Sequence, residues 1–301
     1  MASTAAIAQL NAEFGIPEQV EFTQVHGDLV AAQVSNRHAR ATIMLQGAHV
    51  VAYQQQDAAP LLFVSRQSLY TPGKPIRGGV PLCWPWFGPH PSDPSKPAHG
   101  FARIRQWHML ATQAQSDGST ELRLGLAADA ATMALWPHAF RLELHIQIGA
   151  TLRVDLIMHN SDTAAWSCTG ALHSYFTVGD IEHIRIGGLA GSQYIDKVDQ
   201  NQVKLQDGPI QITSEVDRVY QRTTSTCVIT DPILERQISI AKQGSNTTVV
   251  WNPWQAKAAQ LADLADDEYR SFVCVETANA HDDQILLPPG GEHRLTTILS
   301  T

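Results

Sequence analysis

The segment RLELHIQIGATLRVDLIMH, residues 141–159, decides the fold class of this chain. Apolar and polar residues alternate through both of its halves, which is the pattern of a half-buried strand. Gly149 and Ala150 stand between the halves, and glycine in the first position suits a two-residue type II′ turn because it adopts positive φ at little steric cost. The segment therefore predicts two antiparallel strands joined as a hairpin. The inward-facing residues of this hairpin are Leu142, Leu144, Ile146, Ile148, Leu152, Val154, Leu156 and Met158.

Short apolar runs typical of strands recur on both sides of the hairpin. They are residues 41–54, 61–64, 107–111, 122–126, 166–175, 184–186, 227–229, 236–241, 247–251, 272–276 and 284–287. Helices are indicated at 255–264 and at 3–14, where Ser3 can cap the start, Gly15 can end the helix, and Ile7, Leu10 and Phe14 share one face. Many strands with few helices between them exclude repeated βαβ units. We expect one all-β domain over residues 1–301, a large antiparallel β-sandwich with a peripheral helix around 3–14.

The composition limits the kinds of partner. A net charge of −8 argues against nucleic acid or an anionic membrane surface. The first residues lack a positive region followed by an apolar core, and no run of about 18 apolar residues occurs, so we expect neither a signal peptide nor a membrane span. The four cysteines show no metal-ligand spacing, and we expect reduced, mostly buried thiols in a cytoplasmic protein. The oligomeric state stays open, with a monomer expected. The cysteines are Cys83, Cys168, Cys227 and Cys274.

A long ordered loop is predicted at KPIRGGVPLCWPWFGPHPSDPSKPAHGFARIRQW, residues 74–107. Its prolines remove backbone donors and its glycines permit close backbone approach, so neither a regular helix nor a central strand suits it. Its arginine, tryptophan and histidine side chains are of kinds that bind phosphate or carboxylate, cover the flat face of a sugar or a base, and transfer protons. From this stretch alone, a binding loop and a structural connector whose aromatic rings fill the core are both open.

Two polar residues in apolar surroundings are candidates for proton transfer. His173 lies within GALHSYF, and Glu276 follows the apolar run Phe272–Val275. An unpaired carboxylate is costly to ionise in such surroundings, which raises its pKa towards neutrality and suits a general base. Each residue could instead be a core polar group that backbone hydrogen bonds satisfy.

Several other chemistries have no motif in this sequence. HExxH, GxSxG, GxxxxGK[ST] and GxGxxG are all missing, which argues against a zinc protease, an esterase or a nucleotide-binding loop. The 13 histidines are scattered singly, without a pair at ligand spacing on a strand that also carries a carboxylate. We therefore expect no metal and no other cofactor.

Seven motifs in sequence order resemble the aldose 1-epimerase superfamily, and more narrowly its hexose-6-phosphate mutarotase branch. The resemblance runs from about Gly47 to the C-terminal strands. It implies a galactose mutarotase-like sandwich with the sugar in an open groove. It also implies interconversion of the α and β anomers of a hexose 6-phosphate, with D-glucose 6-phosphate the expected substrate. The motifs are PIRGG (75–79), CWPWFGP (83–89), HGFAR (99–103), ALHSYF (171–176), YIDK (194–197), VVWNPW (249–254) and FVCVETAN (272–279).

The resemblance also implies a role for each of six residues. His173 matches the catalytic acid and Glu276 the catalytic base. His99 and Asp196 match positions that contact the sugar, and Arg77 and Arg103 match basic positions that bind the 6-phosphate. The resemblance gives no role to four further residues. We interpret Arg105 as a solvated charge at a strand end and Lys197 as a partner for Asp196, whereas Trp251 and Trp254 could cover the groove or pack in the core.

The chemistry of anomer exchange fits these residue types. A base removes the proton from the C1 hydroxyl while an acid protonates the ring oxygen, the ring opens, the C1–C2 bond rotates, and the ring closes on the other carbonyl face. One acid and one base suffice, so neither metal nor nucleotide is required. Two other functions stay open at this point: an aldose 1-epimerase for unphosphorylated sugars, and a non-catalytic carbohydrate-binding module.

Overall fold

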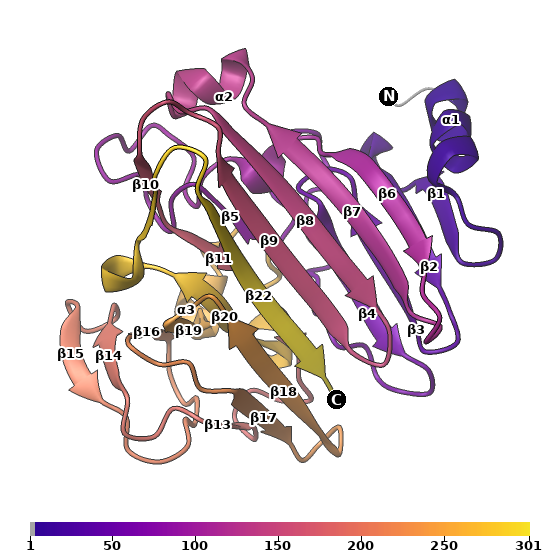
Figure 1. The fold of residues 1–301 in the computed structure, drawn as a ribbon. Coiled ribbons are helices and arrows are strands. Elements are labelled where there is room, and N and C mark those ends of the chain that lie inside the picture. The colour runs from indigo at the N-terminus through magenta and orange to yellow at the C-terminus, as the bar shows by residue number, and fades with distance from the viewer. Residues whose placement is uncertain (1–3) are drawn as a thin grey trace.

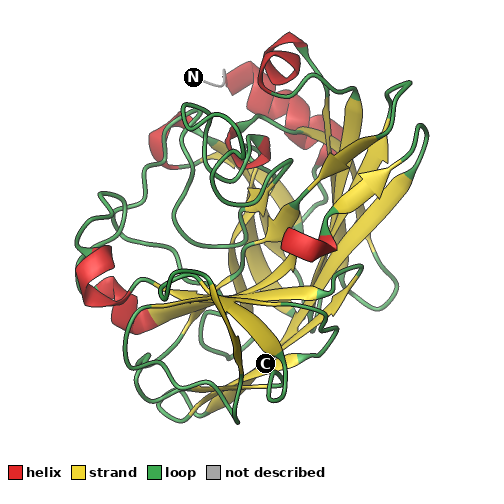
Figure 2. Cartoon of the chain, turned by 90° about the vertical axis from the view of Figure 1, so that its left-hand side faces the viewer, coloured by secondary structure: helices red, strands yellow, loops and turns green. Residues whose placement is uncertain are grey.

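The computed structural model describes residues 4–301 and is built mostly of antiparallel β-sheets (Figure 1). Two sheets have eight strands each, a third has four, and a small two-stranded sheet completes the set. Three short α-helices lie at the periphery, outside the layered strands (Figure 2). The predicted fold class is therefore confirmed. No helix within residues 4–301 is long and apolar enough to cross a membrane.

The predicted hairpin is formed by β8 (Phe140–Ile148) and β9 (Leu152–Asn160), and all eight of its inward-facing residues are fully buried. The predicted turn is wrong, because three residues, 149–151, join the strands and Ile148 pairs with Leu152. A two-residue turn would pair Ile148 with Thr151 and place apolar residues opposite polar ones along both strands. The extra residue aligns the apolar faces of the two strands. Burial of each apolar side chain on that face contributes about 1.5–3 kcal/mol to the stability of the fold.

The first eight-stranded sheet contains this hairpin and has the order β13-β17-β18-β22-β9-β8-β7-β6. The strand β22 was not predicted, although it pairs with β9 over eight residues. The long strands of this sheet lie side by side across the front of Figure 1. The remaining bounds are β13 (Arg185–Gly187), β17 (Cys227–Asp231), β18 (Arg236–Gln243), β22 (Glu292–Ser300), β7 (Thr120–Ala127) and β6 (His108–Ala114).

The second eight-stranded sheet has the order β15-β14-β16-β19-β20-β11-β5, and β12 also pairs with β20. Its centre is β20 (Phe272–Asn279), in which all eight residues are buried. The predicted strand 166–175 is divided into β10, β11 and β12, and β10 pairs separately with β21. The remaining bounds are β15 (Gln202–Leu205), β14 (Gln193–Asp196), β16 (Val216–Tyr220), β19 (Thr247–Asn252), β11 (Gly170–Leu172), β5 (Leu82–Cys83), β12 (Tyr175–Thr177), β10 (Trp166–Cys168) and β21 (Ile285–Leu287).

The four-stranded sheet comes from the N-terminal part of the chain. It contains two strands that were not predicted, β1 (Val20–Gln24) and β2 (Val30–Ser35), followed by β3 (Ala39–Met44) and β4 (His49–Gln55). The predicted strand 41–54 is thus two strands. The strand predicted at 61–64 is wrong, since this stretch makes only isolated bridges, Leu62 with Phe176 and Val64 with Gly78.

The helices differ from prediction at their ends. Helix α1 (Thr4–Phe14) places Ile7, Leu10 and Phe14 against the core as predicted, while the predicted Ser3 cap lies outside the described residues. Helix α3 (Trp254–Ala258) is shorter than the predicted 255–264. Helix α2 (Ala130–Leu135) was not predicted, although Asp129 and Thr132 form a capping box at its start. Four 3₁₀ turns are η1 (His26–Asp28), η2 (Ala102–Ile104), η3 (Glu268–Ser271) and η4 (His281–Asp283).

The loop at 74–107 is irregular, as predicted, apart from β5 and η2. Its Trp84 is fully buried, with its ring against Trp136 at 5.0 Å and Phe140 at 4.6 Å between centroids. The connector interpretation therefore describes this part of the loop well. Gly100 is required because it has φ of +72° and a Cβ there would lie 2.0 Å from the Trp84 carbonyl oxygen.

Candidate active site

The two candidate proton-transfer residues are neighbours across two strands. Leu172 pairs with Thr277 in β11, and Tyr175 pairs with Cys274 in β12, so both strands meet β20 in one register. The gap between them holds His173, which that register places opposite Glu276. Residues opposite each other in an antiparallel pair project from the same face. The sheet itself therefore brings the imidazole and the carboxylate together.

The pair is close and buried. His173 Nε2 lies 3.3 Å from Glu276 Oε1, with side-chain exposures of 8% and 1%. Tyr175 stacks on the imidazole, with centroids 4.8 Å apart and ring planes 11° from parallel, and Trp251 meets it edge-on at 6.1 Å. These rings restrict how the imidazole can turn. The other two polar atoms of the pair, His173 Nδ1 and Glu276 Oε2, are buried without a hydrogen-bond partner among residues 4–301.

Burial disfavours the charge on each member of the pair. The pKa of Glu276 is raised well above its ordinary value, first by burial and then by Asp217. The pKa of His173 is lowered well below its ordinary value, first by burial and then by His99 and Arg103. A neutral imidazole with a carboxylic acid contains the same number of protons as an imidazolium with a carboxylate. The two forms differ by one proton transfer across the 3.3 Å separation.

His99 stands beside the pair, as expected of a sugar-contacting residue. Its ring lies edge-on to that of His173 at 5.6 Å between centroids. Its Nδ1 accepts a hydrogen bond from the backbone N–H of Gly88 at 3.3 Å, so the proton of the neutral ring is on Nε2. Burial and the charge of Arg103 lower its pKa to about 3. His99 is therefore a neutral hydrogen-bonding group at physiological pH.

Arg77 is held by two neighbours. Its Nε and Nη2 donate to Asp263 Oδ1 at 3.2 and 3.0 Å, and its Nη1 donates to the Tyr175 hydroxyl at 3.2 Å. Burial opposes its charge, but Tyr175 and Asp263 raise its pKa above the ordinary value. The guanidinium is thus fixed through the same tyrosine that stacks on His173. Each terminal nitrogen keeps a second N–H for another acceptor.

Arg103 is less constrained than Arg77. Its Nη2 donates to the Ala98 carbonyl oxygen at 2.9 Å, and it makes no ion pair with a carboxylate in the part of the chain described. Its positive charge lowers the pKa of both His99 and His173, so it acts electrostatically on the pair. An unpaired guanidinium at this position is available to an anion.

The structure does not bring Asp196 to the pair. Ile195 pairs with Val219, Val219 with Val249, and Val249 with Glu276, so Ile195 shares the face of Glu276. Asp196 follows Ile195 and points to the opposite face. Its Oδ2 accepts from Lys204 Nζ at 2.7 Å.

The carboxylate that does share this face is Asp217, which sequence reasoning missed. Lys197 pairs with Asp217 at 3.6 Å, so the suggested pairing of Lys197 with Asp196 is wrong. Burial raises the pKa of Asp217, and Lys197 opposes that shift. Both residues act electrostatically on Glu276. The run Val216–Tyr220 lacks clear alternation, so no pattern in the sequence indicated which way Asp217 would point.

Three further side chains are now placed. Trp251 belongs to the site, since its ring contacts those of His173 and Tyr175, while Trp254 packs against Tyr269 at 5.3 Å. Arg105 is only partly exposed, and its Nε is buried without a hydrogen-bond partner among the described residues. The interpretation of Arg105 as a solvated charge at a strand end is therefore wrong for its buried Nε.

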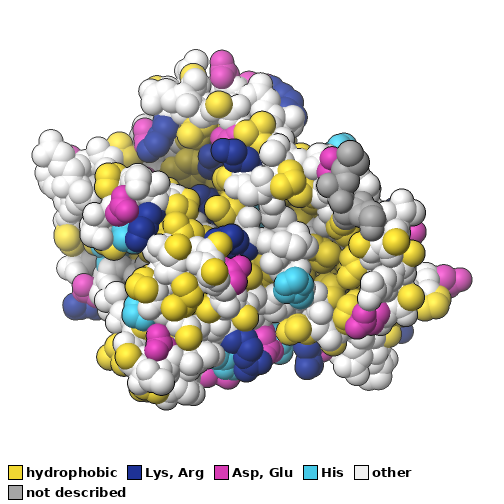
Figure 3. Space-filling model, turned by 90° about the horizontal axis from the view of Figure 1, so that it is seen from above, with side chains coloured by type: hydrophobic (Ala, Val, Ile, Leu, Met, Phe, Trp, Pro, Cys, Tyr) yellow, Lys and Arg dark blue, Asp and Glu magenta, His cyan; other side chains and the backbone are white. Residues whose placement is uncertain are grey.

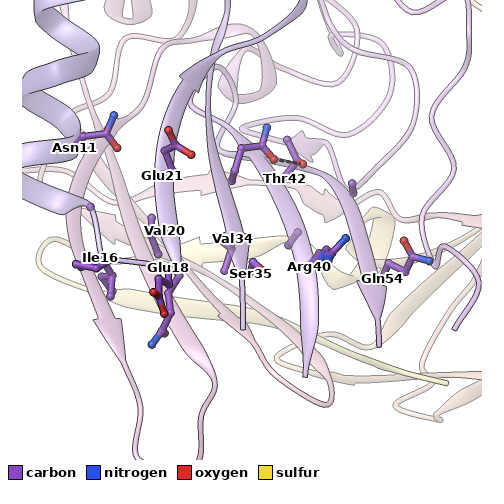
Figure 4. A pocket seen from close by; sticks show the side chains of 16 residues that line it. Asn11, Ile16, Glu18, Val20, Glu21, Val34, Ser35, Arg40, Thr42 and Gln54 are labelled. Carbon is purple, nitrogen blue, oxygen red and sulfur yellow. Dashed lines mark hydrogen bonds between the residues drawn. The ribbon is translucent and has the colours of Figure 1, made fainter. Parts of the chain in front are cut away.

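Two further features of the surface are a hollow and a cavity. Seen from above, the molecule has a hollow with apolar lining and Lys and Arg side chains around it (Figure 3). A cavity of about 750 Å³ lies between α1 and strands β1–β4, with Glu21, Arg40 and Thr42 in its lining (Figure 4). None of the six predicted site residues lines that cavity.

Fold and geometry together define a class of protein, an antiparallel β-sandwich with a buried imidazole–carboxylate pair. The family model "Aldose 1-epimerase" matches residues 31–300. A protein of Escherichia coli (strain K12) named "Putative glucose-6-phosphate 1-epimerase" is 38% identical over 252 residues, covering 83% of each chain. A protein of that name from Salmonella typhimurium is 36% identical over 277 residues, covering 90% of this chain and 92% of its own.

A solved structure agrees with these sequence relatives. The crystal structure of "a putative mutarotase (YeaD) from Salmonella typhimurium" matches with a TM-score of 0.89 and 32% identity, over 98% of both chains. The chain belongs to the aldose 1-epimerase family. The resemblance on which the six site residues were assigned is therefore confirmed at the level of the family.

Proposed function

We propose that this chain interconverts the α and β anomers of a hexose 6-phosphate, with D-glucose 6-phosphate the expected substrate. The observation that carries the proposal is the buried His173–Glu276 pair at 3.3 Å with Arg77 and Arg103 nearby. The relatives named for glucose 6-phosphate support the same choice of substrate. Free cysteines at all four positions support a cytoplasmic location, where thiols stay reduced.

In the proposed mechanism, Glu276 takes the proton of the C1 hydroxyl and His173 gives a proton to the ring oxygen. The open-chain aldehyde forms, the C1–C2 bond rotates, and ring closure reverses both transfers. Because the pair holds one shared proton, a complete cycle returns it to its starting state without help from solvent. Each positioned acid or base typically contributes about 10²- to 10⁴-fold in rate.

The proposed substrate contacts divide between the sheet and the loop. Arg77 and Arg103 would bind the phosphate, because guanidinium groups recognise phosphate oxygens with two parallel hydrogen bonds. His99, as a neutral donor through Nε2, would contact a sugar hydroxyl. Asp217, on the face of Glu276, takes the place in this proposal that the sequence had given to Asp196.

Exchange NMR distinguishes the proposed function from both alternatives. Saturation transfer between the α and β anomeric protons should show strong acceleration for glucose 6-phosphate and weak acceleration for free glucose. Equal acceleration of both would identify an epimerase for unphosphorylated sugars. Binding of glucose 6-phosphate without any acceleration would identify a non-catalytic carbohydrate-binding module.

A further inference from the structure

Cys274 places a thiol next to the imidazole–carboxylate pair. It lies two residues before Glu276 on β20, so both side chains project from the same face of the strand. Tyr175 pairs with Cys274 across the strands, and His173 lies two residues before Tyr175, in the gap between β11 and β12. One ligand atom from each of His173, Cys274 and Glu276 lies within 4.8 Å of the other two. The proposed proton transfers make no use of this thiol.

These three atoms are the donor set that a thiophilic divalent ion prefers. Zinc binds thiolate sulfur at about 2.3 Å and imidazole nitrogen and carboxylate oxygen at about 2.0–2.2 Å. Donors arranged tetrahedrally at those lengths lie about 3–4 Å from one another. The nitrogen and oxygen of the pair are 3.3 Å apart already, and the sulfur is within 4.8 Å. A side-chain movement of about 1 Å would complete three corners of a tetrahedron.

We propose that His173, Cys274 and Glu276 form an inhibitory binding site for a thiophilic divalent cation such as Zn²⁺ or Cd²⁺. Glu276 Oε2 has no hydrogen-bond partner among the described residues, so the carboxylate can bind an ion without losing a bond. His173 Nδ1 also has no partner there. In a resident metal site, the ligating histidine donates its other ring N–H to an acceptor. His173 has no such acceptor, so the ion binds here reversibly, and while bound it replaces the direct contact between the catalytic imidazole and carboxylate.

The charges around the site set how tightly an ion binds. A thiolate and a carboxylate together neutralise a divalent cation, so the buried complex has no net charge. Binding must release the thiol proton and the proton shared by the pair, and both pass to the buffer. Hard Mg²⁺ prefers oxygen ligands and should not bind. The nearby Arg77, Arg103 and Lys197 oppose a cation, and Asp217 favours one. The other titratable neighbours are His99, Cys83 and Tyr175.

The test measures metal binding to the full-length protein without substrate. Cd²⁺ should produce an ultraviolet thiolate-to-metal charge-transfer band, and titration calorimetry in two buffers of different ionisation enthalpy should show proton release. Cys274→Ser should abolish the band and weaken Zn²⁺ binding by about tenfold or more. Cys83→Ser is the matched control and should leave the band intact. Cys83 is also buried and interacts electrostatically with Glu276, but it is not one of the three ligands.

Metal binding does not depend on the proposed function, and only competition with substrate rests on it. Zn²⁺ should raise the apparent KM for glucose 6-phosphate, and Mg²⁺ should leave it unchanged. A Cd²⁺ band that survives in Cys274→Ser, or no band in the wild-type protein, would overturn the metal site. A band in a protein that accelerates no anomer exchange would support the site and refute the proposed function.

Discussion

Replacing Glu276 by glutamine should remove catalysis and make the fold more stable. The side chain is 1% exposed and its Oε2 has no partner among the described residues, so its carboxylate is poorly solvated. Glutamine keeps the shape and cannot ionise. We expect the rate of anomer exchange to fall by about 10²- to 10⁴-fold, the contribution of one positioned base.

The gain in stability should depend on pH with a defined sign. The pKa of Glu276 is raised in the folded protein, whereas an unfolded carboxyl ionises near its ordinary value of 4.5. Below that value both states hold the proton and the carboxyl costs nothing. As the pH rises above it, the unfolded chain releases its proton first, which favours unfolding until the folded group ionises as well. Glu276→Gln should therefore gain stability over the wild type only above about pH 4.5.

Urea unfolding at pH 4 and pH 7, compared with exchange NMR on the same samples, tests both halves of this prediction. At pH 7 we expect the glutamine variant to be more stable by about 0.5–2 kcal/mol, the usual gain when a costly functional group is removed. A variant with near-normal exchange rates would refute the role of Glu276 as base. An equal difference in stability at both pH values would refute the explanation by burial of charge.

Three other predictions follow from the site. Arg77→Ala and Arg103→Ala should each raise KM for glucose 6-phosphate by about ten- to hundredfold, because each variant loses charge-assisted hydrogen bonds to the phosphate. Turnover of free glucose should change much less. Equal losses on both substrates would contradict phosphate binding. Asp217→Asn should raise KM more than Asp196→Asn, whose carboxylate faces away from the pair, and steady-state kinetics on the two variants compares them. The acid limb of the pH–rate profile should lie below pH 6.5, because burial, His99 and Arg103 lower the pKa of His173. The imidazole–carboxylate pair therefore gains its second proton, and loses activity, only below that pH. An acid limb at or above pH 6.5 would contradict this.

The sequence predicts the strands whose side chains alternate cleanly. Leu142 to Met158 reads as a hairpin because one face is apolar throughout, and the structure buries that face completely. β22 and β16 were missed because polar and apolar residues do not alternate cleanly along them. The length of the turn at Gly149 was also predicted wrongly, because it depends on which residues of the two strands face each other.

The sequence likewise predicts some residues of the candidate site and not others. His173 and Glu276 could be singled out from their apolar neighbours and from family motifs. The direction of Asp196 could not, because a residue and its neighbour on a strand point to opposite faces and the register of β14 is a property of the sheet. The proximity of Cys274 to His173 likewise depends on the gap between β11 and β12, which the prediction of a single strand over 166–175 did not include.

The shared register of β11 and β12 against β20 has a consequence for how this family can change. The distance between His173 and Glu276 is fixed by backbone pairing at the centre of a sheet, whereas Arg77 and Arg103 belong to the loop at 74–107. Loops accept substitutions and changes of length far more readily than central strands do. Descendants of such a protein could therefore acquire a new substrate through mutations in one surface segment, while inheriting the chemical step unaltered.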